Sequence, residues 1–519
     1  MNGAQALVRT LVGAGVDVCF MNPGTSEMHT VAALDAVPEM RGVLALFEGV
    51  VTGAADGYGR MAGKPAATLL HLGPGLGNGL ANLHNARRAR TPIVNIVGDH
   101  ATYHKKYDAQ LESDIETVAR NVSGFIRRVE SVEHVASDVA DTVAAASTPP
   151  GQVASLLLPA DAAWTDGAEP AMPVAPPTRG EVGTDRIAAV AAVLRGGEPS
   201  ALFVGGSATR REPLAAAGRI SAHTGAKLMC ETFPARLERG AGIVPVERLA
   251  YLAELASMQL AGLRHLVLVD AKAPVAFFAY PGKESYLVPD GCEVHVLAGG
   301  TEDAASALAA LEAELGATSA ATPSQGSARP ELPSGGALTA ESLSVALGAL
   351  MPEGAIVSDE GITSSIFSGG PTAGAPPHDW LTLTGGAIGQ GLPAAVGAAV
   401  ACPDRRVIAF QADGSALYTL QSWWTMAREG LDVTTILCNN GSYSVLNMEL
   451  QRVGAEPPGP KAKAMLDLKR PDLDFVALAE GLGVTATRAT TNDEFADQLG
   501  RALATPGPTV IEAMIPPAF

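Results

Sequence analysis

Two polar motifs, each placed directly after an apolar run, decide the fold of this chain. The first motif is Gln411-Ala-Asp413-Gly-Ser415, which closes the apolar run Val407–Gln411. The second is Cys438-Asn-Asn440-Gly-Ser442-Tyr443, which closes Thr434–Cys438. The segment between them has room for one turn, one crossover helix and one returning strand. Both motifs are therefore predicted at the carboxyl ends of parallel strands, where open α/β sheets bind ligands.

The side chains of these motifs are suited to a metal ion and a phosphate group. Asp413 and Asn440 offer a carboxylate and an amide oxygen, which are hard ligands of the kind that Mg²⁺ prefers. Gly414 leaves space beside them, and Ser415 is predicted at a helix N-terminus, which favours anions. Either motif alone is better explained as an ordinary turn. Together, at this spacing, they favour a metal and phosphate site.

Two Pro-, Gly- and Ser-rich stretches divide the rest of the chain into three pieces of similar size. They are Thr165–Gly183 and Gly316–Gly336, and neither has helical or strand periodicity. The expected domains are residues 1–165, 184–315 and 337–519. Short apolar runs alternate with amphipathic helical patterns in each piece, which predicts an α/β fold with mostly parallel sheets flanked by helices.

Composition excludes several other classes of protein. The chain has 519 residues, 47% of them hydrophobic and 17% charged, which is typical of a globular protein. Its net charge of −18 disfavours nucleic-acid binding. No apolar run approaches the ~18 residues that span a bilayer, and there is no signal-peptide pattern. Five scattered cysteines suit a reducing cytosol and give no zinc site. We expect a cytoplasmic protein with neither a nucleic-acid nor a membrane partner.

Two ionisable residues of the first piece follow predicted strands. Glu48 ends the apolar run Val43–Phe47 and precedes a helix rich in small residues, so it is either a helix-entry residue or a functional buried acid. His71 ends the strand Ala66–Leu70 and opens a predicted glycine-rich turn, Gly73–Asn78. A histidine is often a surface or satisfied core residue, but the end of a strand is a common place for ligands.

The motif Asp-Gly-Ser followed by Asn-Asn-Gly resembles the GDG…NN cofactor motif of thiamine diphosphate enzymes, with Ala412 in place of the first glycine. The likeness runs through all three pieces and is greatest to benzoylformate decarboxylases and acetolactate synthases. The resemblance implies that Asp413, Asn440 and the carbonyl of Ser442 ligate Mg²⁺. It also implies contacts to the diphosphate from Gly414, Ser415, Tyr443 and Thr363.

A second glycine-rich stretch, Leu383–Pro393, precedes a predicted helix. By itself Gly389–Ala394 fits a loose dinucleotide pattern, but the acidic residue that should follow is missing. The resemblance implies instead that Gly386 contacts the aminopyrimidine of the cofactor through its backbone and that Ile388 supports the bent cofactor. Ile388 could equally be an ordinary core residue.

The resemblance also gives roles to residues of the first piece. The helix that follows Glu48 is similar to the one after the catalytic glutamate of these enzymes, so Glu48 would hydrogen-bond the aminopyrimidine. His71 matches a catalytic histidine of benzoylformate decarboxylase. The turn Asn22–Glu27 resembles the loop that binds the substrate carboxylate, with Thr25 at the position of the family's serine and Ser26 beside it.

Three departures from the pattern affect the substrate pocket. The decarboxylase has a second active-site histidine in a region that here reads Pro274–Pro281 and contains Phe277 and Phe278 instead. Its role is vacant or is filled by one of His100, Tyr103 and His104, although a solvated loop position is the simpler interpretation of either histidine. Glu449 stands where the decarboxylase has an aromatic residue, and acetolactate synthases differ at Gln110 and Leu111.

Together these features predict a thiamine diphosphate- and Mg²⁺-dependent enzyme that decarboxylates a 2-oxo acid, with or without carboligation. The alternative within enzymes is an acetolactate synthase that condenses two 2-oxo acids. The alternative of another class is a flavin- or nucleotide-binding regulatory protein without catalysis. The sequence leaves open whether the central piece binds FAD. We expect a homodimer or homotetramer, and a charged Glu449 predicts that small or polar 2-oxo acids are better substrates than benzoylformate.

Overall fold

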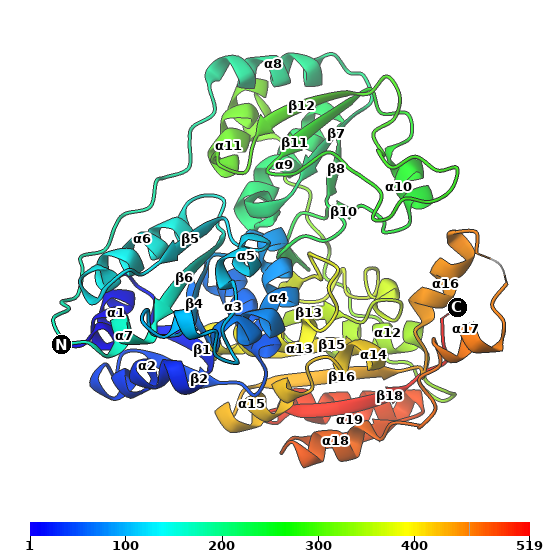
Figure 1. The fold of residues 1–519 in the computed structure, drawn as a ribbon. Helices are drawn as coiled ribbons and strands as arrows, with labels where there is room; N and C mark the ends of the chain where they lie inside the picture. The colour runs from blue at the N-terminus through cyan, green and yellow to red at the C-terminus, as the bar shows by residue number, and fades with distance from the viewer. Residues whose placement is uncertain (456, 519) are drawn as a thin grey trace.

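The computed structural model describes residues 1–455 and 457–518 and contains three mostly parallel sheets flanked by helices (Figure 1). This is the fold class that the sequence predicts. None of the helices within the described residues is both long and apolar enough to cross a membrane. The N-terminus lies beside α1 and α7 of the first sheet (Figure 1).

The first sheet has six parallel strands in the order β2-β1-β3-β4-β6-β5. Its strands are β1 (Val18–Asn22), β2 (Arg41–Leu44), β3 (Ala66–Leu70), β4 (Ile93–Asp99), β5 (Phe125–Arg128) and β6 (Val153–Pro159). Its helices are α1 (Gly3–Gly13), α2 (Met28–Ala33), α3 (Glu48–Ala62), α4 (Leu72–Ala89), α5 (Ile115–Arg120), α6 (Val135–Ser147) and α7 (Ala160–Trp164), with 3₁₀ turns η1 (Thr25–Glu27), η2 (Leu34–Ala36), η3 (Lys105–Tyr107) and η4 (Val132–His134). Side chains of α1 and α6 pack on one face, and those of α3 and α4 pack on the other.

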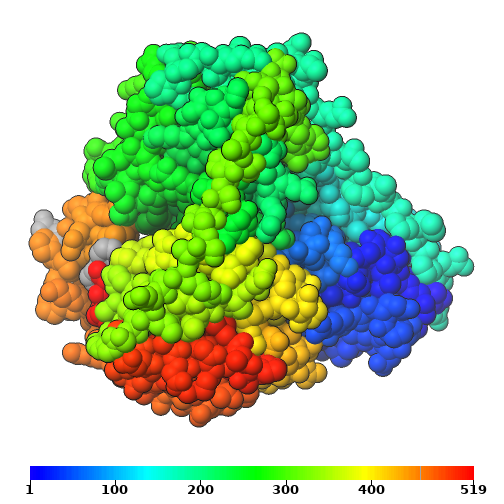
Figure 2. All heavy atoms as spheres, turned by 180° about the vertical axis from the view of Figure 1, so that it is seen from behind, coloured from blue at the N-terminus to red at the C-terminus, as the bar shows by residue number. Residues whose placement is uncertain are grey.

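The central sheet has five parallel strands in the order β10-β8-β7-β11-β12. Its strands are β7 (Ser200–Val204), β8 (Lys227–Cys230), β10 (Glu247–Arg248), β11 (His265–Val269) and β12 (Glu293–Ala298). Around it lie α8 (Thr184–Arg195), α9 (Arg211–Thr224), α10 (Ala253–Leu260) and α11 (Ala304–Leu315), with η5 (Gly206–Thr209) and η6 (Ala317–Ser319). Figure 2 shows the chain after α11 as a light-green strip that descends over the surface to the third sheet.

The third sheet has seven strands in the order β17-β18-β16-β15-β13-β14-β9. Its strands are β13 (Ile356–Glu360), β14 (His378–Leu381), β15 (Val407–Ala412), β16 (Val433–Asn439), β17 (Thr485–Ala489), β18 (Thr509–Met514) and β9 (Leu237–Arg239). Its helices are α12 (Ala340–Leu350), α13 (Gly391–Ala401), α14 (Asp413–Ala416), α15 (Gln421–Glu429), α16 (Ser444–Arg452), α17 (Pro460–Ala464), α18 (Phe475–Gly481) and α19 (Asn492–Ala504), with η7 (Ser365–Phe367).

The edge strand β9 departs from a simple division of the chain into three pieces. It belongs to the central piece by sequence but pairs antiparallel with β14, from His378↔Arg239 to Trp380↔Leu237. The other strand pairs of the third sheet are parallel. Strand β9 has only three residues and no strong apolar pattern. The sequence does not predict it, because its pairing with β14 is a contact between residues far apart in the chain.

The first and third sheets are held together by the packing of α3 on α13. A side chain at Gly57 would collide with the carbonyl of Ala394, and one at Gly397 would collide with the carbonyl of Ala54. Buried side chains of both sheets form one continuous core at this contact. Small residues thus let the two helices approach closely, and this contact fixes the position of the first sheet relative to the third.

Candidate active site

The predicted metal residues lie at the carboxyl ends of neighbouring parallel strands. Asp413 directly follows β15, and Asn440 directly follows β16, which pairs with β15 from Val407↔Val433 to Ala412↔Cys438. Asp413 is 3% exposed and Asn440 is 5% exposed. The placement deduced from the spacing of the motifs is therefore present in the structure.

The carboxylate of Asp413 connects the two strand ends. Its Oδ2 accepts the backbone N–H groups of Asn440 at 3.0 Å and Gly441 at 2.7 Å, and its Oδ1 accepts that of Gly414 at 2.8 Å. Burial raises the pKa of Asp413, although these N–H donors favour its charged form. No lysine, arginine or histidine among the described residues forms an ion pair with it. A buried carboxylate without a cationic partner is costly, so this donor set fits a bound metal cation.

The residues around Asp413 leave little free space. An added Cβ at Gly414 would lie 2.5 Å from Cε1 of Tyr443, so glycine is needed for the ring to approach. The hydroxyl of Ser415 accepts a hydrogen bond from Gln411 at 2.6 Å and donates to the carbonyl of Ala412 at 3.1 Å. Helix α14, which contains Ser415, has only four residues. The expected helix N-terminus is therefore a single turn, and its dipole is weaker than the sequence suggested. Thr363 is buried.

The glycine-rich loop before α13 is held by a residue that the sequence analysis did not single out. Glu360 ends β13 and is 1% exposed. Its carboxylate accepts the backbone N–H groups of Gly389 at 2.7 Å and Gly391 at 2.7 Å, and the side-chain amide of Gln411 at 2.9 Å. Burial raises the pKa of Glu360 to about 7, against the effect of these donors. Glu360 thus links the loop to the strand that leads to Asp413.

Gly386 and Ile388 lie in this same loop. Gly386 has a φ of +74°, a conformation that favours glycine, and the ring of Phe277 packs directly against it. Ile388 is half-buried and is a member of none of the buried core clusters. This exposure disfavours the core alternative for Ile388 and leaves its side chain available to a ligand.

Glu48 lies at the first position of α3, at the carboxyl edge of the first sheet. It is 6% exposed, and its Oε2 accepts a hydrogen bond from Nδ2 of Asn78 at 3.0 Å. Asn78 belongs to α4, which begins at Leu72. The predicted turn over Gly73–Asn78 was wrong: these residues are helical. Their glycines serve close packing instead, because a Cβ at Gly75 would lie 3.2 Å from Oε1 of Glu48.

His71 forms a pair with Glu27. Nδ1 of His71 lies 2.7 Å from Oε2 of Glu27, and the same oxygen accepts the backbone N–H of Gly24 at 2.8 Å. Glu27 is 2% exposed, and its second oxygen has no hydrogen-bond partner among the described residues. Burial raises the pKa of Glu27, while the N–H of Gly24 and His71 favour its charged form. A carboxylate bound to one ring nitrogen fixes the orientation of the imidazole and leaves Nε2 for a ligand.

The remaining candidates of the first sheet lie near this pair without direct bonds to it. Thr25 is exposed and Ser26 is half-buried in the turn η1. His100 follows β4, the strand next to β3, and its Nε2 is buried without a partner among the described residues. Its ring lies 5.2 Å from that of His104.

The structure corrects one element of the predicted substrate pocket. The carboxylate of Glu449 does not stand free, because it accepts hydrogen bonds from Tyr251 at 3.1 Å and Tyr280 at 2.8 Å. Nε of Arg452 lies 3.7 Å from it. These contacts join α16 to the central domain and compensate the charge that the sequence argument had placed against the substrate. Phe278 is 53% exposed and stacks edge-on with Phe277, 4.9 Å between ring centroids.

The structure thus gathers candidate site residues into two separate polar clusters. Glu48, His71 and Glu27 form the first, at the first sheet, and Asp413 and Asn440 form the second, at the third sheet. Within the described part of the chain, no hydrogen bond or ion pair joins one cluster directly to the other. Glu27, Glu360 and Asn78 were missed by sequence reasoning. Only Glu27 had a signal, because it ends the same turn that contains Thr25.

Comparison with known proteins identifies the family to which the chain belongs. Residues 1–119 match the N-terminal TPP binding domain of thiamine pyrophosphate enzymes, and residues 371–513 match the C-terminal TPP binding domain. The chain is 61% identical over 519 residues to the "Putative acetolactate synthase large subunit IlvX" of Mycobacterium tuberculosis, covering 99% of each chain. It is 29% identical over 528 residues to benzoylformate decarboxylase of Pseudomonas aeruginosa, covering 96% of each.

The solved structures agree with these matches at the level of the fold. The thiamine diphosphate-dependent 4-hydroxybenzoylformate decarboxylase of Rhodococcus jostii superposes with a TM-score of 0.86 at 24% identity, over 99% of both chains. Given these matches along the whole chain, the protein belongs to the thiamine diphosphate-dependent enzyme family of decarboxylases and acetolactate synthases.

Proposed function

We propose that this chain decarboxylates a 2-oxo acid without oxidation, using thiamine diphosphate and Mg²⁺. The observation that carries the proposal is the pair of His71 and Glu27 next to Glu48, at the carboxyl edge of the first sheet. Thiamine diphosphate, when bound, supplies the ring that accepts the electron pair released as the carboxylate leaves. The side chains of the protein would bind, orient and move protons.

Asp413, Asn440 and the carbonyl of Ser442 would hold Mg²⁺. Gly414, Ser415, Tyr443 and Thr363 would border the diphosphate. Gly386 and Ile388 would contact and support the rest of the cofactor. The fit rests on the buried carboxylate of Asp413, which has no cationic partner among the described residues, and on the half-buried side chain of Ile388.

Glu48 would exchange a proton with the aminopyrimidine, since its Oε1 has no hydrogen bond among the described residues. His71, oriented by Glu27, would hold or donate a proton at the reacting carbon through Nε2. Thr25 and Ser26 would bind the carboxylate of the substrate, and the buried Nε2 of His100 is a second possible proton donor near the same edge.

The second candidate is condensation of two 2-oxo acids by an acetolactate synthase-type reaction. The name of the 61% identical relative favours it. Both reactions release CO₂ and need the same groups on the first and third sheets, so they differ in what accepts the remaining fragment. A proton from His71 would end a decarboxylation, whereas a second 2-oxo acid would end a condensation. The presence of Glu48, Asp413 and Asn440 disfavours the regulatory alternative.

For the substrate, we propose a 2-oxo acid with an apolar or aryl tail, which reverses the expectation from sequence. Phe277 borders the loop at Gly386, and it forms one aromatic cluster with Phe233, Tyr251 and Phe278. Glu449 lies behind the hydroxyls of Tyr251 and Tyr280, so it would not repel an apolar group from this wall.

A panel of 2-oxo acids tests both the reaction and the substrate. We expect benzoylformate and branched-chain 2-oxo acids to release CO₂ faster than pyruvate at equal concentration. Free aldehyde as the second product would support decarboxylation, and acetohydroxy acid or hydroxyketone would support condensation. Phe277→Ala should weaken the preference for apolar tails, with Met172→Ala, in an exposed part of the chain, as the control. A wild-type preference for pyruvate would contradict the aromatic wall.

The pH dependence of the reaction should report Glu27. Its raised pKa means that it gains a proton, as the pH falls, earlier than an ordinary glutamate, and a protonated carboxyl orients His71 less well. We expect kcat/KM of the wild type to fall on the acid side through this pKa. Glu27→Gln should lose that limb and have a lower plateau, because glutamine does not ionise. An unchanged acid limb in the variant would assign it to another group.

We further propose that the site is completed by a second copy of the chain. Exposed apolar side chains flank both clusters, which is typical of a surface that is covered in an assembly. They are Leu46, Tyr103, Ile366, Leu417 and Tyr418. Leu46→Asp should therefore reduce both the dimer fraction in sedimentation and the activity, whereas Met172→Asp should change neither. A fully active wild-type monomer would exclude this assembly.

We propose that the central domain binds no flavin diphosphate at the usual position. That position is the crevice between β7 and β11, where the connections diverge to opposite sides of the sheet. Here it is filled by Asp270, whose Oδ2 accepts both the backbone N–H and the hydroxyl of Ser207 at 2.8 Å. Arg90 forms an ion pair with Asp270, and the half-buried Glu231 accepts a hydrogen bond from the backbone N–H of Gly206 at 3.3 Å. A diphosphate would need these backbone N–H donors, which the two carboxylates already occupy.

A further inference from the structure

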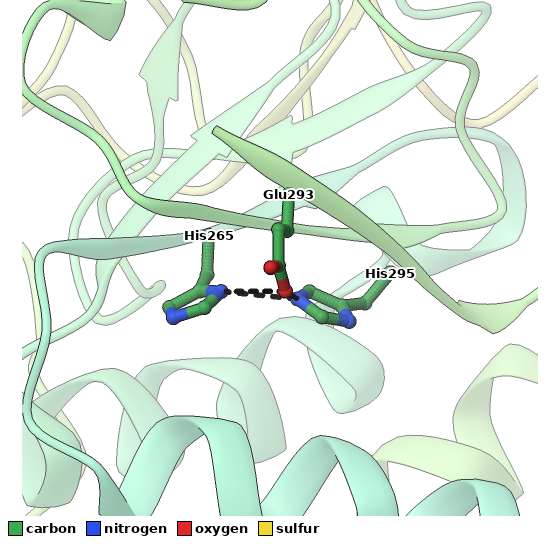
Figure 3. A group of neighbouring side chains, drawn as sticks. All are labelled: His265, Glu293 and His295. Atoms are coloured by element: carbon green, nitrogen blue, oxygen red, sulfur yellow. Dashed lines mark hydrogen bonds and ion pairs between the residues drawn. The ribbon is translucent and has the colours of Figure 1, made fainter. Parts of the chain in front are cut away.

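Two histidines and a glutamate meet at the amino-terminal edge of the central sheet. His265 is the first residue of β11, Glu293 is the first residue of the edge strand β12, and His295 lies two residues further along β12. The register pairs His265 with Glu293 and Val267 with His295. Side chains two residues apart share one face of a strand, and Figure 3 shows the three side chains turned toward one another.

The distances between their polar atoms are close to those of a metal site. Nδ1 of His265 lies 3.1 Å from Nε2 of His295. Oε2 of Glu293 lies 3.8 Å from the first nitrogen and 3.9 Å from the second. Tetrahedral zinc, with bonds of about 2.0–2.1 Å, places its ligand atoms about 3.3–3.4 Å apart. Shifts of about 0.5 Å would therefore bring all three atoms into one coordination sphere.

A fourth residue orients the first histidine. Glu198 accepts a hydrogen bond from Nε2 of His265, with 3.1 Å between the two atoms. The proton on Nε2 leaves the lone pair of Nδ1 directed at the cluster, and a carboxylate behind a histidine is the usual support of a zinc ligand. Nε of Arg264 lies 4.0 Å from the other oxygen of Glu198, so the guanidinium group pairs with Glu198 and not with Glu293.

The two histidines are more buried than the glutamate. The side chain of Glu293 is 73% exposed, whereas those of His265 and His295 are 13% and 22% exposed. The cluster is thus reachable from solvent on the side of Glu293, and the histidines are held by the sheet.

We propose that His265, His295 and Glu293 bind one divalent transition-metal ion of the zinc class, with a solvent molecule or other exchangeable ligand in the fourth position. Two imidazoles and one carboxylate are ligands that zinc accepts readily and that Mg²⁺ does not prefer. Glu198 acts as the positioning residue. No cysteine takes part. The ion would join β12, an edge strand, to β11, at the end of the sheet opposite to Asp270 and apart from Glu48 and Asp413.

The alternative is a simple hydrogen bond between two imidazoles with carboxylates beside them. In that case a proton holds the cluster together, and zinc has no advantage over other cations. The two cases differ in stoichiometry, in the geometry of the bound ion and in the effect of removing Glu198.

Metal titration of the untagged holoenzyme, with excess thiamine diphosphate and Mg²⁺ present, tests the proposal. We expect one Zn²⁺ per chain in competition with a chromophoric chelator. His265→Gln or His295→Gln should weaken Zn²⁺ binding at least 100-fold, and Glu198→Gln should weaken it about 10- to 100-fold. His223→Gln, an exposed histidine of α9 in the same domain, serves as the matched control and should bind as the wild type does.

Co²⁺ gives a second measurement that is independent of activity. Bound at this site, it should show the intense visible bands of four-coordinate cobalt, and His295→Gln should lose them. Each variant should keep wild-type turnover and melting behaviour without zinc, which shows that it is folded. Absence of Zn²⁺ binding in the folded wild type would overturn the proposal. Equal binding in the His265→Gln, His295→Gln and His223→Gln variants would do so as well.

Discussion

Glu48→Gln should lower kcat by about 10²–10⁴-fold, the usual range for a group in acid–base catalysis, while thiamine diphosphate remains bound. Glutamine has nearly the same shape and can still accept the hydrogen bond that Asn78 donates to Oε2. It cannot exchange a proton with the aminopyrimidine. The exchange of the C2 proton of the bound cofactor with deuterium should therefore slow together with turnover.

The control for this variant is Glu39→Gln, which changes an exposed glutamate of the same domain. It should exchange the C2 proton and turn over at the wild-type rate. Wild-type exchange in Glu48→Gln would mean that Glu48 only begins the helix α3. Loss of bound cofactor in that variant would assign it a binding role in place of proton transfer.

Asp413→Ala should abolish retention of thiamine diphosphate. The substitution removes the carboxylate proposed to ligate Mg²⁺, and with it three hydrogen bonds from backbone N–H groups, so the ends of β15 and β16 lose the side-chain connection between them. Loss of an outer-shell partner of a metal ligand lowers metal affinity about 10- to 100-fold. The affinity of Asp413→Ala for the cofactor should fall by more than this. Cofactor content after gel filtration in Mg²⁺ measures the effect.

Asp472→Ala, which alters an exposed aspartate in the same domain, should retain the cofactor as the wild type does. Far-ultraviolet circular dichroism separates loss of the site from loss of the fold. If folded Asp413→Ala retained thiamine diphosphate with normal affinity, the metal and diphosphate site would have to lie elsewhere.

Local sequence was sufficient where a residue's position along the chain determines its position in space. Asp413 and Asn440 each follow an apolar run, and parallel strands that are neighbours must end at the same edge. The fold class follows from the same alternation of apolar runs and amphipathic segments. The run Gly73–Asn78 shows the limit of this reasoning. Glycines that allow close packing in a helix give the same sequence pattern as glycines that form a turn.

Contacts between residues distant in sequence could not be predicted in this way. Glu449 was recognised as a charge in an unusual place, but its partners Tyr251 and Tyr280 belong to another domain. Without them the carboxylate had to be assumed free, so the expectation about the substrate rested on a charge that the fold holds in hydrogen bonds. The pair of Glu27 and His71 depends in the same way on two strands that are adjacent only in the folded sheet.

Strand β9 lies in the central piece by sequence but pairs with β14 of the third sheet, which has a practical consequence for protein engineering. A chimera that replaces residues 184–315 as a module would remove Leu237–Arg239 and open the edge of β14 that faces away from β13. An open edge strand of this kind is a template for association between chains. Recombination of central domains among relatives should therefore give soluble hybrids only when the incoming segment brings its own edge strand for β14.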